Sequence, residues 1–215
     1  MKFEASKVTL LDALQTAQNA IPSKTTLQIL NNFLFKLKGN NLEITATDLD
    51  LTIVINIEVQ GNGDGNIVIN AKKFLEVTKE LPDLPVICHV DDYVMTIKSE
   101  TGFQCNITGF DASEYPVLPK SQESAQFEIS KHDLKTLFEK TSFAVSNDVT
   151  TRVSLTGVFW QSVNDQIIMV GTDGHRLGKS WIKGTGPGLT KGIILPPKAV
   201  SQVLKTSHEE SDQIK

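Results

Sequence analysis

The stretch MKFEASKVTLLDALQTAQNAIP at residues 1–22 decides the fold, because it recurs as AQFEISKHDLKTLFEKTSFAVS at residues 125–146. Two more blocks recur in the same order. LEITATDLDL (42–51) matches QIIMVGTDGHR at an offset of 125 residues, and NIVINAKKFLEVTK (66–79) matches GIILPPKAVSQVLK (192–205) at an offset of 126. Three ordered blocks whose offset drifts by one residue each time predict a domain of about 120 residues that is duplicated in tandem. The identities in the first block are Phe3/Phe127, Glu4/Glu128, Ser6/Ser130, Lys7/Lys131, Leu10/Leu134 and Ala20/Ala144.

The Pro- and Ser-rich stretch DASEYPVLPKSQESAQ (111–126) is the predicted boundary between the copies. We expect a first domain over 1–118, a linker over 119–125 and a second domain over 126–215. In the register of the repeat, Lys215 corresponds to about Cys88 or His89, where the first copy still has strands to come. A second copy that stops there leaves sheet edges unpaired, so we expect a truncated or incompletely determined chain.

Each copy reads as a strand, a helix and several further strands, which predicts an α+β fold with largely antiparallel sheet. In the first copy we expect a strand at 2–5 and a helix at 7–20, with Ser6 as N-cap and an apolar stripe at 8, 10, 11, 14, 17 and 21. Strands are expected at 32–38, 41–47 and 51–59, with hairpin turns at Gly39-Asn40 and at GNGDG (61–65). A second strand and helix are expected at 66–70 and 71–81, and then strands near 86–90, 93–98 and 102–108.

The composition describes an ordinary globular chain of 215 residues, 40% hydrophobic and 21% charged. The sequence holds no apolar run long enough for a bilayer span and no signal-peptide core, so we expect a cytoplasmic location. Cys88 and Cys105 lie within strand-like runs without zinc-binding spacing, and we expect them to remain thiols. We expect no cofactor and no metal.

The charge is unevenly distributed along the chain. The formal net charge is −4, which argues against a protein that coats nucleic acid with its whole surface. The four predicted helices, however, carry nine lysines and five acids, or +4, which leaves 12 basic and 20 acidic residues, or −8, elsewhere. Lysines are also good helix formers on solvated faces. Their recurrence in both copies favours a surface that faces a polyanion and contacts phosphates without sequence preference.

The densest cluster of chemical groups is Thr172-Asp173-Gly174-His175-Arg176-Leu177. Asp173 and His175 could form an acid/base pair of a hydrolase, but the sequence supplies no accompanying nucleophile or phosphate loop. The first copy has Thr47-Asp48 at the same place, so Thr-Asp is more simply a strand-end turn with Asx-type hydrogen bonds. The added polar groups beside Leu155 and Leu177 fit a small recognition pocket better than a reaction centre.

Several segments together resemble the bacterial DNA polymerase III beta subunit, the sliding clamp. They are KTTLQILNNFLF (24–35), TATDLDL (45–51), DASEYPVLP (111–119), TRVSLTGV (151–158) and GTDGHRLG (171–178), and they cover the whole chain in order. The resemblance implies a non-enzymatic processivity factor: three such domains per subunit and two subunits that close head to tail into a ring with sheets outside and helices lining the hole. This chain resembles domain one and most of domain two, so we expect the third domain to be absent from it and the chain to be unable to form that ring by itself.

The resemblance also implies roles for individual residues. It places the pocket for short motifs of the polymerase alpha subunit, the clamp loader and repair proteins at Arg152, Leu155, Thr172, Gly174, His175, Arg176 and Leu177. It places contacts to duplex DNA at Lys24, Lys72, Lys198, Lys205 and the 146–149 loop with Ser146 and Asn147, and the subunit interface at Lys73 and Phe103. This chain departs from the family at Lys24, where arginine is usual, and at Gln28, where proline is common. Besides the hydrolase, a nucleic-acid-binding module that forms no ring remains an alternative.

Overall fold

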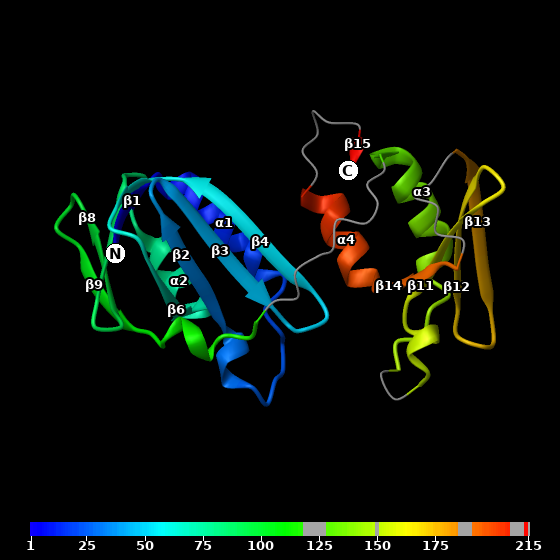
Figure 1. Cartoon of the computed structure of the whole chain (residues 1–215), viewed down its shortest axis with the longest axis horizontal. Coiled ribbons are helices and arrows are strands. Elements are labelled where there is room, and N and C mark those ends of the chain that lie inside the picture. Colours follow the sequence, from blue (N-terminus) through cyan, green and yellow to red (C-terminus); the bar gives the residue numbers. More distant parts are fainter. Residues whose placement is uncertain (118–127, 149–150, 185–190, 207–212, 215) are drawn as a thin grey trace. The chain divides into compact units, whose positions relative to one another are not determined.

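The structure is a computed structural model that describes residues 1–117, 128–148, 151–184, 191–206 and 213–214, without the side chains of Thr206 and Gln213. It divides into two compact units, Met1–Pro119 (unit 1) and Lys120–Lys215 (unit 2). The linker expected over 119–125 lies outside the described residues. Figure 1 shows that each unit combines helices with a sheet.

Unit 1 holds two antiparallel sheets and two main helices. One sheet has the strand order β5-β1-β7-β8-β9 and the other has the order β4-β3-β2-β6. The elements are β1 (Lys2–Ala5), α1 (Lys7–Gln18), the short 3-10 helix η1 (Gln28–Asn31), β2 (Asn32–Lys38), β3 (Asn41–Thr47), β4 (Thr52–Glu58), β5 (Gln60–Asn62), β6 (Gly65–Asn70), α2 (Ala71–Glu80), β7 (Val86–Asp91), β8 (Val94–Ser99), β9 (Gln104–Thr108) and the 3-10 helix η2 (Ala112–Glu114).

Unit 2 repeats this plan in its described residues. Its four-stranded sheet has the order β13-β12-β11-β14, and β10 pairs with β15. The elements are β10 (Ile129–Ser130), α3 (Lys131–Ser142), the 3-10 helix η3 (Val153–Leu155), β11 (Val158–Val163), β12 (Gln166–Thr172), β13 (Leu177–Lys183), β14 (Ile193–Leu195), α4 (Pro197–Thr206) and β15 (Gln213–Ile214). By position in the repeat, β13-β12-β11-β14 corresponds strand for strand to β4-β3-β2-β6, and the pair β10–β15 corresponds to β1–β7. The expected α+β fold with antiparallel sheets is confirmed.

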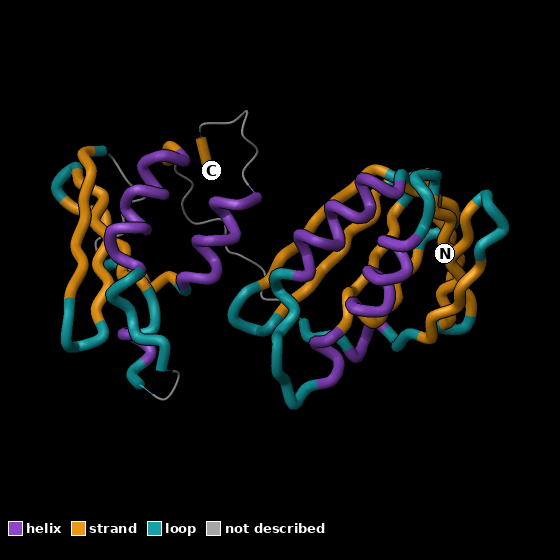
Figure 2. Tube along the Cα trace, turned by 180° about the vertical axis from the view of Figure 1, so that it is seen from behind, coloured by secondary structure: helices purple, strands orange, loops and turns teal. Residues whose placement is uncertain are grey.

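The helices lie on one face of the four-stranded sheet in each unit, as the tube view shows (Figure 2). The core of unit 1 fills the space between α1, α2 and the strands, and the ring of Phe35 on β2 meets that of Phe74 on α2 edge to face at 5.1 Å. The core of unit 2 is a separate cluster that includes Leu137, Trp160 and Met169. No helix in the described part of the chain is long and apolar enough to cross a membrane.

The amphipathic pattern of α1 differs in detail from the expectation. Its buried residues are Leu10, Ala13, Leu14 and Ala17, so the stripe keeps the helical period from residue 10 onward. The apolar pattern predicts Val8 on this stripe, but Val8 is 53% exposed, because two residues along a helix turn a side chain by about 200° from Leu10.

Ser6 occupies the N-cap position without a side-chain cap bond, whereas its counterpart Ser130 accepts a 3.0 Å bond from the Asp133 amide.

The segment GNGDG (61–65) does not form the expected hairpin turn. It connects β5, which pairs with β1, to β6, which pairs with β2, so the chain crosses here from one sheet to the other. Asp64 helps to hold this crossing, because its Oδ1 accepts a 2.9 Å hydrogen bond from the amide of Gly39. The Gly39-Asn40 turn between β2 and β3 is confirmed, with Gly39 at a φ of 57°.

Candidate functional site

The turn between β12 and β13 is organised by its own side chains. Asp173 Oδ1 accepts hydrogen bonds from the amides of His175 (2.9 Å) and Arg176 (3.0 Å). Thr172 Oγ1 donates to the carbonyl oxygen of Arg176 (2.7 Å) and accepts from the amide of Gly174 (3.1 Å). Gly174 has a φ of 91°, which is the region that glycine adopts without steric cost. The turn therefore holds His175 and Arg176 in a fixed position at the end of the sheet.

The corresponding turn of unit 1 has the same hydrogen bonds. Asp48 Oδ1 accepts from the amides of Asp50 (3.2 Å) and Leu51 (2.7 Å), and Thr47 Oγ1 bonds the amide of Leu49 (3.0 Å) and the carbonyl of Leu51 (3.2 Å). The interpretation of Thr-Asp as a structural turn is confirmed. Because Asp173 serves this turn, it does not provide the base that the hydrolase alternative needs.

The protonation of Asp173 agrees with this role. Hydrogen bonds from the backbone of His175 and Arg176 lower the pKa of the Asp173 carboxyl to about 2, with a smaller contribution from the Arg176 side chain. Its other oxygen, Oδ2, accepts a 2.9 Å bond from Arg176 Nε. A carboxylate that is bonded to two amides and a guanidinium is a poor proton acceptor at neutral pH.

Arg176 is held from a second side by an aromatic ring. Its guanidinium carbon lies 5.9 Å from the centroid of the Phe143 ring, within range of a cation–π contact. Phe143 directly follows α3 and is 57% exposed. Nε of Arg176 bonds Asp173 while the guanidinium carbon lies over the Phe143 ring, so two contacts orient the guanidinium. Exposed Leu177 and Val153 add apolar surface in this part of unit 2.

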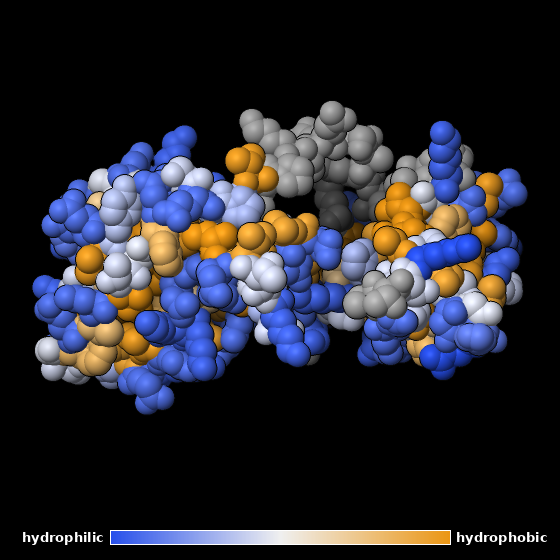
Figure 3. Space-filling model, turned by 90° about the horizontal axis from the view of Figure 1, so that it is seen from below, coloured by the Kyte–Doolittle hydropathy of each residue, from blue (hydrophilic) through white to orange (hydrophobic). Residues whose placement is uncertain are grey.

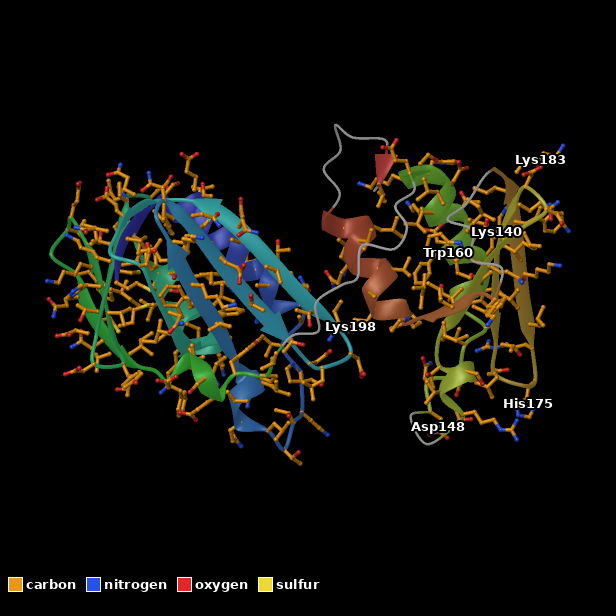
Figure 4. All side chains as sticks on the ribbon, in the orientation of Figure 1. Lys140, Asp148, Trp160, His175, Lys183 and Lys198 are labelled. Carbon is orange, nitrogen blue, oxygen red and sulfur yellow. The ribbon has the colours of Figure 1, made fainter. Side chains whose placement is uncertain are left out.

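The loop before η3 contributes the remaining residues of the predicted pocket. Arg152 is the N-cap of η3, and Leu155 is the last residue of η3. The carbonyl of Leu155 accepts a 2.8 Å bond from the amide of Ser146, which ties the two ends of the loop together. Figure 4 shows Asp148 of this loop and His175 of the turn at the same end of unit 2, with Lys183 at the opposite end of the sheet. Arg152 and Arg176 are the two arginines of the whole sequence.

Two glycines let α3 pack closely against this hairpin. Gly171 and Gly178 are paired across β12 and β13. A Cβ atom on Gly171 would lie 2.1 Å from the carbonyl oxygen of Thr141, and one on Gly178 would lie 2.7 Å from that of Lys140. The flanking glycines of the GTDGHRLG segment thus set the distance between the C-terminal turn of α3 and the β12–β13 turn that carries His175.

The residues predicted to contact DNA are distributed over the helices and loops. Lys72 on α2 and Lys198 and Lys205 on α4 have exposed side chains, and Lys24 is exposed in the loop before η1. Ser146 and Asn147 lie in the loop before η3, and Val149 of that loop lies outside the described residues. With the observed bounds the helices still carry nine lysines and five acids, or +4.

Lys7 is one of these lysines, but its Nζ donates to the carbonyls of Lys79 (3.2 Å) and Leu81, so it ties the start of α1 to the end of α2.

The residues predicted for the subunit interface lie in unit 1. Lys73 is exposed on the first turn of α2, where its amide bonds Asn70 Oδ1 at 3.0 Å. Phe103 is 41% exposed directly before β9, which is the last strand of the five-stranded sheet. The backbone of β9 therefore has a side without a partner strand in the described part of unit 1.

Phe143 is the residue of this site that the sequence analysis did not single out. The signal for it was weak: an apolar residue directly after a helix, at the position where the first copy has Asn19. Its contact with Arg176 joins residues 33 positions apart in the sequence and becomes evident only in the folded unit.

Both units match the same family in sequence. Residues 1–119 match the family model for the N-terminal domain of the DNA polymerase III beta subunit, and residues 128–215 match the model for its central domain. The beta sliding clamp of Chlamydia trachomatis is 29% identical over 213 residues, which are 98% of this chain and 50% of that protein. The beta sliding clamp of Bacillus subtilis is 30% identical and is matched by all of this chain over 59% of its own length.

Solved structures agree with the sequence comparison. The DNA polymerase sliding clamp of Bacillus subtilis has a TM-score of 0.90 at 30% identity, and that of Caulobacter crescentus has a TM-score of 0.90 at 28% identity. Each match covers 99% of this chain, and 58% and 59% of the respective solved chains. This chain thus spans between half and three fifths of the length of these relatives. With both units matched in order by the family's own domains, the chain belongs to the DNA polymerase III beta subunit family.

Proposed function

We propose that this chain is the part of a DNA sliding clamp that comprises its first domain and most of its second, and that the complete clamp encircles duplex DNA and tethers the replicative polymerase to it. The observation that carries the proposal is the repetition of one strand order, β4-β3-β2-β6 and β13-β12-β11-β14, in two units that each match a domain of the clamp family. Holding a ring on DNA requires no covalent step, so the protein acts as an accessory subunit and not as an enzyme.

The contact with DNA is made by lysines on an acidic protein. Lys24, Lys72, Lys198 and Lys205, with Ser146 and Asn147, face the phosphates, while the rest of the chain carries a net charge of −8. Lysine presents a compact charge on a flexible stem and contacts phosphate without fixed geometry. Such contacts carry no sequence information and exchange easily, which suits a ring that must slide.

The salt dependence of loading tests this role. In the complete clamp, alanine at Lys24, Lys72, Lys198 and Lys205 should reduce retention on nicked circular DNA. The slope of the logarithm of the binding constant against the logarithm of the salt concentration should become shallower by about 0.9 for each phosphate contact that is lost. Alanine at Lys36, Lys38, Lys98 and Lys183, which lie on strands, is the matched control and should leave the slope unchanged. The unaltered clamp should remain on circular DNA and leave the same DNA once it is linearised. Equal retention on both forms would exclude a closed ring and favour a plain nucleic-acid-binding module.

The second function of the site is to hold partner proteins by short linear motifs. Arg152, Leu155, Thr172, Gly174, His175, Arg176 and Leu177 form one wall of the pocket, and its partners are the polymerase III alpha subunit, the clamp loader and repair proteins. An oriented guanidinium beside exposed Leu177 combines a hydrogen-bond donor with an apolar surface, as peptide-recognition sites require. Tethering by such a pocket raises the local concentration of the polymerase at the DNA.

A labelled peptide that carries a clamp-binding motif of the polymerase tests the pocket by fluorescence anisotropy with the complete clamp. His175→Ala and Arg176→Ala should each weaken binding by about tenfold, the loss expected for one well-made polar contact to a charged group. Lys183→Ala, at the opposite end of the same sheet, should not change it (Figure 4). Unchanged affinity in both pocket variants would show that the motif binds elsewhere.

The subunit contact belongs to the β9 edge of unit 1, with Lys73 and Phe103. A strand of a second subunit that pairs with β9 would satisfy its free backbone groups and cover Phe103, which is 41% exposed. This proposal applies to the complete clamp, which forms a head-to-tail homodimer. Phe103→Asp should convert that dimer to monomers in sedimentation velocity, whereas Phe110→Asp, at another exposed phenylalanine of unit 1, should leave it dimeric.

A further inference from the structure

The four-stranded sheet of unit 2 has one face that the helices cover and one open face. Gly178 of β13 is buried, and a Cβ on it would meet the carbonyl of Lys140 on α3, so this side of β13 faces the helices (Figure 2). The alternate residues Lys179, Trp181 and Lys183 are exposed. Because successive side chains of a strand point to opposite faces, these three lie on the open face of the sheet.

Trp181 lies within an apolar surface on this open face. Its side chain is 58% exposed, although tryptophan is highly buried in most proteins. In the strand register Trp181 pairs with Ile168, while Lys179 pairs with Val170, which pairs in turn with Phe159. These three apolar neighbours are half-buried. Figure 3 shows apolar side chains at the surface of unit 2 among polar ones. A contiguous apolar surface of this kind is typical of a binding site.

The repeat shows that the fold itself does not require this surface. Three of its residues differ in kind from their counterparts in unit 1 at the offset of 125, which are Asn56 for Trp181, Glu58 for Lys183 and Glu43 for Ile168. In unit 1, Glu43 is paired within the sheet, because its Oε1 lies 3.2 Å from Nζ of Lys36. The same strand order therefore forms without a tryptophan between two lysines, and these residues of unit 2 are available for a function other than folding.

The charge of the open face is positive. Strands β11, β12, β13 and β14 contain no aspartate or glutamate. Lys179 and Lys183 form no ion pair with any residue of the described part of the chain. Two acids lie at the ends of these strands: Asp173 is bonded to Arg176, and Asp165 lies in the β11–β12 turn, next to the end of β13 that carries Lys183. Two lysines against the one remaining acid, Asp165, still leave the face positive.

Single-stranded DNA carries the groups that match this face. Lys179, Trp181 and Lys183 follow one another at about 6.8 Å along the strand, so a base stacked on the indole directs the phosphates on its two sides towards the lysines. Stacking on aromatic rings combined with cationic contacts to the backbone is how proteins bind single strands without sequence preference. A four-stranded sheet whose aromatic side chains stack bases is also the binding surface of a common class of RNA-binding domain.

Two other classes of ligand fit the face less well. Duplex DNA keeps its bases stacked on one another, so it can reach the lysines but not the indole of Trp181. An acidic peptide would satisfy the lysines, but it covers the indole only if an aromatic residue stands between its acids. Every nucleotide of a single strand, in contrast, brings both a phosphate and a flat base.

We propose that the open face of the unit 2 sheet, centred on Trp181 with Lys179 and Lys183, binds single-stranded DNA. One base stacks on Trp181, the neighbouring bases cover Ile168 and Phe159, and the lysines contact the phosphates. The inference rests on the proposed function only for the choice of DNA over RNA, since stacking and lysine contacts do not distinguish the two. It uses none of the residues proposed for duplex DNA or for the partner peptide.

Titration of octathymidylate into the ¹⁵N-labelled full chain tests the site. The indole N–H of Trp181 and the amides of 179–183 should shift, and the emission of Trp181 should be quenched, while buried Trp160 should change little. A strand of the same length with abasic sugars keeps the phosphates without the bases, and it should bind at least about tenfold more weakly. A blunt-ended DNA duplex should leave the Trp181 indole resonance in place.

Substitutions with matched controls in unit 1 separate stacking from charge. Trp181→Ala should weaken octathymidylate by about tenfold, whereas Trp181→Phe, which keeps a ring, should stay within about threefold. Asn56→Ala, at the counterpart of Trp181, should change nothing. Lys179→Ala should make the dependence of log affinity on log salt concentration shallower by about 0.7, the value for one phosphate contact of a single strand. Lys36→Ala, at a strand lysine that Glu43 pairs, should leave it unchanged.

The possible outcomes separate this site from the proposed function. Octathymidylate that binds equally well to Trp181→Ala and to the unaltered chain, or that shifts only amides of the helices, would refute the site and leave the clamp function intact. Loss of retention on circular duplex DNA would do the reverse, because nicked duplex offers no unpaired bases to Trp181. Stronger quenching of Trp181 by acetyl-Glu-Phe-Glu-amide than by octathymidylate would overturn the proposal in favour of a peptide partner, and tenfold tighter binding of octauridylate would overturn it in favour of RNA.

Discussion

At the scale of single residues, the Thr-Asp pair is the unit that this fold uses to close a hairpin and to position the residues directly after it. In both units the aspartate accepts two backbone amides and the threonine bridges the turn, so the geometry is the same while the exposed residues differ. Unit 2 places His175 and Arg176 on this scaffold, and unit 1 places Asp50 and Leu51 there. One turn therefore presents two different surfaces.

The ionisation of Asp173 provides a prediction at this scale. Its folded-state pKa of about 2 lies below the unfolded value, so the carboxylate stabilises unit 2 at every pH above about 4, and this contribution is lost as the pH falls towards 2. At pH 3 the Asp173 carboxyl carbon should still show the ¹³C shift of a carboxylate. Arg176→Met should raise this pKa only partway, because the two backbone amides, the larger cause, remain. A midpoint near 4 in the unaltered chain would contradict the hydrogen bonding described for the turn.

The same pH range includes a second group, which has to be resolved separately. Hydrogen bonds from Ser113 and Tyr93 lower the pKa of Asp111 to about 2. Bulk acid unfolding therefore does not isolate Asp173, and the titration has to be read from its own resonance. Asp165→Asn, in the β11–β12 turn at the other end of β12, is the control that should leave the Asp173 titration unchanged, because Asp165 has a φ of 53° that asparagine also tolerates.

At the scale of elements, the packing of α3 on the β12–β13 hairpin depends on two residues without side chains. Gly171 and Gly178 face the carbonyls of Thr141 and Lys140, and the aromatic ring of Phe143 lies directly where the helix ends. The close approach of helix and hairpin thereby brings Phe143 within reach of Arg176. A change in the distance between α3 and the β12–β13 hairpin would therefore displace the Arg176 guanidinium, even if none of the residues that contact it were altered.

Gly171→Ala should consequently destabilise unit 2 by about 2 kcal/mol or more, because the added Cβ meets backbone and not a flexible side chain. Gly184→Ala is the matched control, since its nearest neighbour would be Ile167 Cδ1 at 3.9 Å, and it should change stability by less than about 0.5 kcal/mol. Urea unfolding followed by tryptophan fluorescence measures both variants. Equal urea midpoints for Gly171→Ala and Gly184→Ala would show that α3 can shift away from the sheet at no cost in stability.

At the scale of the whole molecule, the chain consists of two units with separate hydrophobic cores. Twenty-six buried residues form the main core of unit 1, and ten form the core described in unit 2. Tyr115 packs on Leu34 and Val68 of unit 1 and is 4% exposed, and burial raises its pKa to about 12. The last described segment before the second unit is therefore fastened to the first.

Unequal cores predict unequal stability. In urea, unit 2 of this 215-residue chain should unfold at a lower concentration than unit 1, since the core formed by its described residues is smaller and removes less apolar area from water. The two tryptophans, Trp160 and Trp181, both lie in unit 2, so fluorescence reports that unit alone, while far-UV circular dichroism reports both. Dichroism should show a second transition after fluorescence has reached its plateau, and a fragment of residues 1–117 should retain that transition. Coincident curves from both probes would show that the units unfold together.

Much of this fold was predictable from the sequence because the sequence contains two copies of the same domain. The matching blocks identified the repeated unit, and runs such as NFLFKLK (32–38) and NLEITAT (41–47) coincide with β2 and β3. The errors arose where local pattern and long-range pairing disagree. GNGDG has the composition of a hairpin turn, but its flanking strands pair in different sheets. Val8 is apolar, but its place on the helix turns it to solvent.

The sequence by itself determined the family, the α+β class, the Thr-Asp turns and the basic character of the helices, because each of these depends on residues close together in the chain or on the repeat. Only the tertiary structure decided that Phe143 makes a cation–π contact with Arg176, that Lys7 caps α2, and that Leu27 and Leu49 line a pocket in unit 1. Such contacts join side chains far apart in sequence. Their geometry depends on how closely helix and sheet approach, which no local pattern of residues records.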